Sequence, residues 1–188
     1  MPEKKGEAKP EKLLMRKYIF EGYAMKLRVD TVLAADGHRS TREIIERIDC
    51  VAVVAVDAAD NILLVNQFRA PLWKNLLEIP AGGIEKGEDT EEAVIREMRE
   101  ETGFKPAKVV RLGGFYLSPG FCSEYCHVYL ATDLTEEPLH AEDTAGIELV
   151  KIPAVQILDT ITSGRLQDSK SIAGILYYLE YKKKPQNP

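Results

Sequence analysis

Cysteine is scarce in this sequence of 188 residues. Its three cysteines, Cys50, Cys122 and Cys126, form an odd and sparse set, which argues against the disulfide framework of a small secreted protein. Cys126 adjoins His127 and follows Cys122 by four positions, a spacing that zinc ligands can have. Because no second pair of ligands stands at a suitable spacing, buried thiols in strands are the favoured interpretation.

Long apolar runs and an excess of positive charge are absent too. No apolar run approaches the roughly 18 to 20 residues that a membrane helix needs. The charged start, MPEKKGEAKPEK, has no apolar segment behind it and is unlike a signal peptide. The net charge of -5 is unlike the basic surface of a protein that binds duplex nucleic acid. We therefore expect a cytoplasmic protein that binds neither membranes nor nucleic acid.

The remaining composition is that of a globular protein. Apolar residues make up 45% of the chain, which is sufficient for a hydrophobic core. The length fits one compact domain with a modest N-terminal extension. We expect a flexible arm at residues 1–16, a strand region at 17–48 and a main domain at 49–183.

Strand patterns outnumber helix patterns along the chain. Between residues 18 and 32, Leu27 and Val29 alternate with Arg28 and Asp30, as in a half-buried strand. Because strands and helices do not alternate regularly, we expect an α+β fold with a mixed sheet and helices on its faces. Further strands are predicted at 41–48, 50–56, 62–68, 107–115, 124–132 and 147–152, and helices at 89–102, 155–163 and 169–181.

The predicted helix at 89–102 carries clear boundary signals. Asp89 is a candidate N-cap, and Glu92 three positions on completes a capping box. Gly103 is placed to cap the C-terminal end. The apolar stripe of the helix consists of Val94, Ile95 and Met98.

Three carboxylates share one flank of this helix. Glu97, Glu100 and Glu101 stand at positions i, i+3 and i+4, where like charges destabilise a helix by about 0.2–0.5 kcal/mol per pair. They also lie near the C-terminal end, where the helix dipole disfavours anions. Either water screens these charges on a solvated face, or a cation binds them. Magnesium suits the second arrangement, because it binds carboxylates, waters and substrate phosphates.

The segment from Gly82 to Phe104 resembles the Nudix box. The box has a Gly, five residues, a Glu, seven residues and then Arg-Glu-apolar-x-Glu-Glu-x-Gly-apolar, and Gly82, Glu88 and Arg96 begin its three parts here. By this resemblance the chain is identified as a member of the Nudix hydrolase family. The resemblance implies an α/β/α sandwich with a mixed β-sheet and an added N-terminal antiparallel strand segment.

The same resemblance implies a metal site. Glu97 and Glu101 are similar to the principal metal ligands of the family, and Glu100 to a ligand of a second or third ion. The backbone carbonyl of Ala81 is similar to the group that completes the metal shell. The ion implied is Mg²⁺, with Mn²⁺ as a substitute. The groups that support these ligands by resemblance are Glu88 and Arg96.

The identity of the catalytic base stays open. Related enzymes often use a Glu in the loop before the last strand, where Glu142 is the nearest match and Asp143 is one methylene shorter. A box glutamate, Glu100 or Glu101, is the alternative. If Glu142 and Asp143 have no catalytic role, the acidic loop that contains them is simply a solvated segment.

Residues outside the box resemble the ADP-ribose pyrophosphatase branch of the family. Pro119 stands sixteen positions after Gly103, in a Ser-Pro-Gly segment that is closed by Glu124. Such a segment also favours a β-turn in any protein. The segments 65–69 and 77–82, and more weakly 40–43, are similar to the same branch. With the closing segment 164–170, the resemblance covers roughly residues 18–180.

This branch implies a set of substrate-binding residues. Arg42 and Arg69 would contact diphosphate or ribose, since a guanidinium binds phosphate oxygens through two parallel hydrogen bonds. An ordinary salt bridge is the alternative for either arginine. Glu78 and Glu124 would meet ribose hydroxyls or a water of the metal shell, beside Pro119.

The implied activity is the metal-dependent hydrolysis of ADP-ribose to AMP and ribose 5-phosphate. Alternative substrates are GDP-mannose, NADH and FAD, because the box specifies only a nucleoside diphosphate derivative. A module that binds nucleotide without cleaving it is disfavoured, because the box glutamates are all present. The family further implies a homodimer in which the strand region 17–48 is exchanged between subunits.

Overall fold

The computed structural model describes residues 11–141 and 146–184, and these residues form two compact units. The first unit contains the residues up to Ile48 together with Ser118–Glu124. The second unit contains Asp49–Leu117 and the residues from Tyr125 onward. In the described residues no helix is long and apolar enough to cross a membrane.

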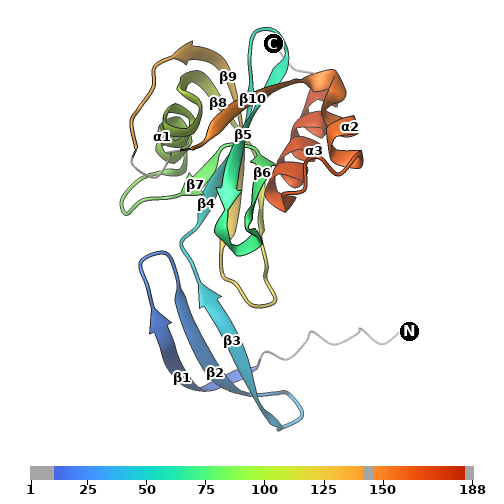
Figure 1. The fold of residues 1–188 in the computed structure, drawn as a ribbon. Helices are drawn as coiled ribbons and strands as arrows, with labels where there is room; N and C mark the ends of the chain where they lie inside the picture. Colours follow the sequence, from blue (N-terminus) through green and yellow to red (C-terminus); the bar gives the residue numbers. More distant parts are fainter. Residues whose placement is uncertain (1–10, 142–145, 185–188) are drawn as a thin grey trace, which may run out of the picture. The chain divides into compact units, whose positions relative to one another are not determined.

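The first unit is a three-stranded antiparallel sheet with the order β1-β2-β3 (Figure 1). Its strands are β1 (Lys12–Glu21), β2 (Lys26–Leu33) and β3 (Arg39–Glu46). The segment 18–32, predicted as a single strand, is divided by a turn in which the Gly22 N–H donates to the Met25 carbonyl at 3.0 Å. β1 begins at Lys12, inside the range for which we predicted a flexible arm.

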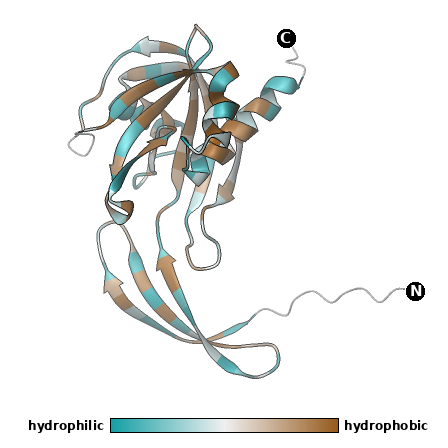
Figure 2. Ribbon diagram, turned by 45° about the vertical axis from the view of Figure 1, so that its right-hand side comes forward, coloured by the Kyte–Doolittle hydropathy of each residue, from teal (hydrophilic) through white to brown (hydrophobic). Residues whose placement is uncertain are grey.

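The polar face of β2 is covered by ion pairs. Asp30 is 4% exposed and lies 3.2 Å from the Arg16 guanidinium and 3.3 Å from that of Arg28. The apolar residues Leu27 and Val29 on the other face are only half-buried. The alternation was therefore predicted, but the more deeply buried face is the charged one. Figure 2 shows hydrophobic and hydrophilic segments along all three strands.

The second unit is built on a seven-stranded mixed sheet. Its main path has the order β10-β5-β4-β9-β8, with β6 paired to β5 and β7 to β4. β4 and β9 are parallel, and the other pairs are antiparallel. The strands are β4 (Cys50–Val56), β5 (Asn61–Arg69), β6 (Lys74–Glu78), β7 (Ala81–Gly83), β8 (Phe104–Tyr116), β9 (Tyr125–Glu136) and β10 (Glu148–Pro153).

Helices cover both faces of this sheet, as Figure 1 shows. α1 (Thr90–Thr102) lies on one face, and α2 (Ile157–Thr162) and α3 (Ser169–Lys183) lie on the other. Two short 3₁₀ helices, η1 (Ala70–Leu72) and η3 (Ala154–Gln156), precede β6 and α2. The predicted α/β/α sandwich with a mixed sheet is confirmed, whereas β6 and β7 were not predicted.

The central strand β4 supplies both hydrophobic cores. Ala52 and Val54 pack in the core on the α3 side, and Val51 and Val53 pack in the core on the α1 side. All four are fully buried, and burial of each valine contributes about 1.5–3 kcal/mol relative to an exposed side chain. Cys50 and Cys126 are buried in β4 and β9, as predicted for strand thiols, while Cys122 lies in the loop of the first unit.

The predicted boundaries of α1 are confirmed. The Asp89 side chain accepts from the backbone N–H of Glu91 at 2.8 Å and of Glu92 at 2.9 Å. The Glu92 side chain accepts in return from the Asp89 N–H at 3.1 Å, which completes the capping box. Gly103 ends the helix with a φ of 78°. In the apolar stripe Val94 and Met98 are fully buried, but Ile95 is half-buried.

Asp57 holds the turn between β4 and β5. Its Oδ1 accepts from the N–H groups of Ala59 and Asn61, each at 3.0 Å, and its Oδ2 lies 3.2 Å from the Lys151 ammonium. Burial opposes ionisation, but hydrogen bonds from Asn61, Lys151 and Ala59 outweigh it and lower the pKa of Asp57 to about 2. Because the folded pKa lies below the ordinary value, the stability that the carboxylate contributes is complete above about pH 4 and is lost as the pH falls toward 2.

We predict that Asp57→Asn lowers the free energy of unfolding at pH 7 and that the loss shrinks as the pH falls from about 4 toward 2. Urea denaturation of both proteins at a series of pH values measures this difference. Asp36→Asn is the control, because the Asp36 side chain is 74% exposed in another turn. A difference that stays constant down to pH 2 would contradict the assignment.

Candidate active site

The Arg96 guanidinium forms hydrogen bonds with three glutamates of the second unit, where the loop after β7 meets α1. Its Nε and Nη2 donate to the two oxygens of Glu88 at 2.8 and 3.0 Å. Its Nη1 donates to Glu97 at 2.6 Å and to Glu100 at 3.1 Å. Nη2 also donates to the Gly83 carbonyl at 2.8 Å. The expected pairing of Arg96 with the carboxylates is present, and these partners, Glu88 first, raise the pKa of the guanidinium above its ordinary value.

Glu97 occupies the space that a side chain at position 82 would fill. A Cβ on Gly82 would lie 1.9 Å from Oε1 of Glu97. The backbone of Gly82 is held in the sheet opposite Val51 of β4. Only glycine therefore lets the Glu97 carboxylate approach the β7 backbone this closely.

Glu101 lies beside the same strand. Its Oε2 accepts from the Ala81 N–H at 3.0 Å. Burial, and to a smaller extent the charge of Glu97, raise the pKa of Glu101 to about 8, against the opposing effects of the Ala81 hydrogen bond, Lys170 and Arg69. Two carboxylates thus share a poorly solvated region that resists a second negative charge.

This donor set fits a hard divalent cation. In the part of the chain that the structure describes, no three His, Cys, Asp or Glu side chains already converge as a metal cluster. Glu97, Glu101 and the Ala81 carbonyl are nevertheless oxygen donors of the kind that Mg²⁺ takes. The missing Cβ of Gly82 leaves room for the carboxylate, and a cation would offset the repulsion between the two glutamates.

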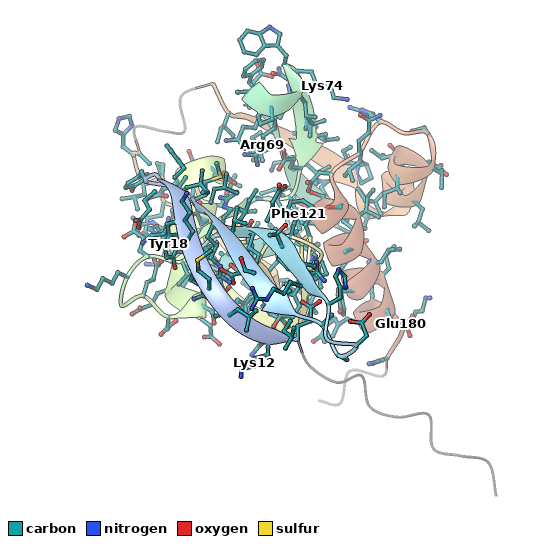
Figure 3. The ribbon with its side chains drawn as sticks, turned by 90° about the horizontal axis from the view of Figure 1, so that it is seen from below. Lys12, Tyr18, Arg69, Lys74, Phe121 and Glu180 are labelled. Carbon is teal, nitrogen blue, oxygen red and sulfur yellow. The ribbon has the colours of Figure 1, made fainter. Side chains whose placement is uncertain are left out.

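A second charged cluster surrounds Glu78, which is 1% exposed. Arg69 donates to its Oε1 through Nε at 2.6 Å and to its Oε2 through Nη2 at 2.7 Å, and the Lys170 ammonium also donates to Oε2. Burial opposes ionisation of Glu78, but Arg69 and Lys170 outweigh it and lower its pKa. Both oxygens of Glu78, predicted to meet ribose or water, are thus bonded to cationic side chains. Figure 3 labels Arg69 on the β5–β6 hairpin, opposite Lys74.

The N-terminus of α3 holds this cluster in place. Asp168 is the N-cap and accepts from the Ser171 N–H at 2.9 Å and from the Lys170 ammonium at 3.0 Å. The Ser171 hydroxyl accepts from the Ile79 N–H at 2.8 Å. Sequence reasoning assigned no role to Lys170 or Asp168, although both lie in the segment 164–170 that resembles the ADP-ribose pyrophosphatase branch.

The other predicted substrate residues lie in the first unit. The Arg42 guanidinium donates to Glu11, to the Ser40 hydroxyl at 2.6 Å and to the Thr41 carbonyl at 2.9 Å. Its salt bridge with Glu11 is the alternative that the sequence left open. The substrate role of Arg42 stays a prediction.

Pro119 and Glu124 belong to the loop of the first unit. The Ser118 carbonyl accepts from the N–H groups of Phe121 at 3.1 Å and Cys122 at 2.8 Å, so the expected turn at Pro119 is present. Glu124 is 8% exposed, and its Oε2 lies 3.5 Å from Nε of Arg47. The substrate roles of both residues stay predictions.

The candidate bases are only partly described. Glu142 and Asp143 lie outside the described residues. Glu100 is bonded to Arg96, and Glu101 to the Ala81 N–H. The choice among these four carboxylates stays a prediction.

Known proteins resemble this chain over most of its length. A family model described as NUDIX domain matches residues 46–171. An ADP-ribose pyrophosphatase of Bacillus subtilis (strain 168) is 37% identical over 169 residues, which are 89% of this chain and 91% of that protein. A methanol dehydrogenase activator of Bacillus methanolicus is 36% identical over 178 residues, 92% of this chain and 94% of its own length. A GDP-mannose pyrophosphatase of Yersinia enterocolitica is 32% identical over 147 residues, 72% of this chain and 76% of that protein.

A solved structure has the same fold. A crystal structure described as that of an ADP compounds hydrolase superposes with a TM-score of 0.86, covering 95% of this chain and 97% of that chain. Because its sequence identity is 20%, this likeness bears on the fold alone.

We predict that Gly82→Ala weakens the binding of Mn²⁺ by more than about tenfold, because the new Cβ displaces the Glu97 carboxylate. Isothermal titration calorimetry measures the affinity, and circular dichroism checks that the fold is retained. Gly120→Ala is the matched control, because a Cβ at Gly120 meets nothing within 4 Å. Equal Mn²⁺ affinity in both variants would exclude Glu97 as a ligand.

Proposed function

Because this chain belongs to the NUDIX domain family, we propose that it is a Nudix hydrolase that converts ADP-ribose and water to AMP and ribose 5-phosphate. The observation that carries the proposal is the cluster in which Arg96 holds Glu88, Glu97 and Glu100 against the Gly83 carbonyl. A module that only binds nucleotide would not need all of these carboxylates. The ADP-ribose pyrophosphatase of Bacillus subtilis, similar over 89% of this chain, supports the choice of substrate.

Glu97, Glu101 and the Ala81 carbonyl would hold Mg²⁺, or Mn²⁺ in its place, and Glu100 would share a further ion. When bound, such a cation would neutralise the diphosphate oxygens and lower the pKa of the attacking water. Arg96 keeps Glu97 in position by a hydrogen bond of 2.6 Å. Glu101 would bind a cation only after losing its proton, so a cation and the proton would compete for this carboxylate.

The reaction breaks one P–O bond of the diphosphate. A water molecule attacks one phosphorus, its proton passes to a carboxylate of the chain, and the bridging oxygen leaves with the other phosphate. Glu142 is the first candidate for the proton acceptor, and Asp143, Glu100 and Glu101 are the others. Each product then carries one phosphate.

Cationic side chains would bind the anionic substrate in this acidic protein, whose net charge is -5. Arg69 is held by Glu78, and its side chain is 38% exposed and therefore only partly buried. We propose that Arg69 and Arg42 contact diphosphate or ribose. Pro119 and Glu124 would line the region that binds the ribose.

The second candidate is the same chemistry on another nucleoside diphosphate derivative. The GDP-mannose pyrophosphatase of Yersinia enterocolitica, which is 32% identical, favours GDP-mannose as the first alternative, ahead of NADH and FAD. The relative from Bacillus methanolicus is named as an activator of methanol dehydrogenase. Comparison of ADP-ribose, GDP-mannose, NADH and FAD as substrates separates the candidate activities.

We predict that the protein releases AMP from ADP-ribose with Mg²⁺ and that chelation with EDTA abolishes the reaction. Glu101→Gln should lower kcat/KM by about 100-fold or more, because it removes a charged ligand. Glu136→Gln is the control, because Glu136 is exposed at the end of β9. Chromatography of the products from ADP-ribose, GDP-mannose, NADH and FAD measures the outcome. Preferential cleavage of another compound would replace the substrate, and AMP release that EDTA does not reduce would refute the metal site.

We also propose a homodimer that buries the apolar surface of the first unit. Every residue of β1 is exposed, including Leu13 at 47%, Met15 at 58% and Phe20 at 53%. An exposed strand edge with apolar side chains associates readily with another chain. Exchange of the strand region 17–48 between subunits is the arrangement that the family favours.

We predict a solution mass of twice the chain mass of 21.1 kDa. Phe20→Glu should shift the protein toward the monomer, because a buried charge destabilises the contact. Multi-angle light scattering measures the mass. Val155→Glu is the control, because Val155 is 86% exposed in the second unit. A wild-type protein that is monomeric at micromolar concentration would refute the dimer.

A further inference from the structure

Lys170 is a buried lysine outside the Nudix box. It is 9% exposed and lies in the first turn of α3. Its ammonium donates to Glu78, and to the N-cap carboxylate of Asp168 at 3.0 Å. A lysine is seldom buried unless it is paired, so these two contacts account for its position.

The four charges of this cluster balance. Glu78 and Asp168 are anionic, and Arg69 and Lys170 are cationic. Glu78 is more deeply buried than Arg69, whose side chain is 38% exposed. Removal of the Lys170 charge would leave the buried Glu78 carboxylate with Arg69 as its cationic partner. Loss of one partner from a buried charge cluster is strongly destabilising, so we expect Glu78 and Arg69 to shift.

The orientation of Arg69 depends on Glu78. Nε and Nη2 of Arg69 bind the two carboxylate oxygens at 2.6 and 2.7 Å, so the plane of the guanidinium follows the plane of the carboxylate. Lys170 holds the same carboxylate through Oε2. The Nη1 end of Arg69 lies outside this pair.

The cluster is also tied to the strand of the proposed metal site. Ser171, the neighbour of Lys170, accepts from the Ile79 N–H at 2.8 Å. Two residues further along the chain, the Ala81 N–H donates to Glu101. The start of α3 thus fixes both Glu78 and the backbone that leads to Ala81.

We propose that Lys170 is a positioning residue for the diphosphate of the substrate: it holds Glu78, and Glu78 sets the orientation in which the Arg69 guanidinium binds phosphate oxygens. This inference rests on the proposed function for the identity of the substrate. The residue that touches the substrate is Arg69, and Lys170 acts through Glu78.

The first test compares Lys170→Met with the wild type. KM for ADP-ribose should rise about tenfold, while kcat changes by less than about threefold, because the misplaced group binds the diphosphate in both ground and transition states. Lys170→Arg keeps the charge and should restore most of the affinity. Lys182→Met is the matched control in the same helix, since the half-exposed Lys182 ammonium contacts Asp60 and the Tyr178 ring and not Glu78. A fall in melting temperature with KM unchanged would show a structural role and overturn the proposal.

The second test is a double-mutant cycle with Arg69→Met. In the Arg69→Met background, Lys170→Met should change KM by less than about twofold, because its effect passes through Arg69. Independent effects of the two substitutions would contradict the proposal. The same four proteins are also compared by the dissociation constant of ADP in the presence of Mg²⁺, a measurement that does not require turnover. If the wild type binds ADP but cleaves no compound, the proposed function fails, and the cycle measured in the dissociation constant of ADP still tests Lys170. If the wild type binds no ADP, the positioning role is overturned.

Discussion

The negative charges of Glu88, Glu97 and Glu100 in the Nudix box are balanced by one cationic side chain, Arg96. All five N–H groups of its guanidinium have acceptors: three glutamates and the Gly83 carbonyl. Without this cation Glu88, Glu97 and Glu100 would repel one another where little solvent screens them. A lysine has only three donors on a single nitrogen and could not join a carbonyl and three carboxylates in one plane. The Arg96 network therefore sets which carboxylates remain available for a cation.

The pairing of β4 with β7 and the packing of α1 hold the residues of this network in position. β4 is buried on both faces, and its pairing with β7 fixes the backbone at Ala81 and Gly82. α1 is anchored by its capping box and by the buried side chains of Val94 and Met98. Together these contacts set the Glu97 carboxylate against the backbone of Gly82, where any side chain would collide with it. The strands and α1 thus set the positions of the site residues, and the absence of a side chain at Gly82 leaves space for the Glu97 carboxylate.

The sequence predicted the features that depend on local spacing. The capping box at Asp89, the cap at Gly103 and the box carboxylates follow from fixed offsets along the chain, and the structure contains them. The burial of β4 on both faces follows from its continuous apolar run. The mixed sheet was expected because strands outnumber helices without regular alternation.

Contacts between distant parts of the chain could not be predicted in this way. Lys170 and Glu78 are 92 positions apart, and no spacing rule relates them. Asp30 carries a charge that suggests exposure, yet ion pairs with Arg16 and Arg28 bury it. The single glycine at Gly22 gave too weak a turn signal to separate β1 from β2. These features depend on tertiary pairing, which a single sequence does not reveal.

We propose above that Glu97, which Arg96 holds in place, and Glu101, which is bonded to the Ala81 N–H, bind a divalent cation against the diphosphate. A crystal structure with Mn²⁺ and a non-hydrolysable analogue of ADP-ribose would test this site, because anomalous scattering locates manganese. We expect an anomalous peak within bonding distance of Glu97, Glu101 and the Ala81 carbonyl, in contact with the diphosphate. A bound analogue with no manganese at these three groups would show that they are not the metal ligands.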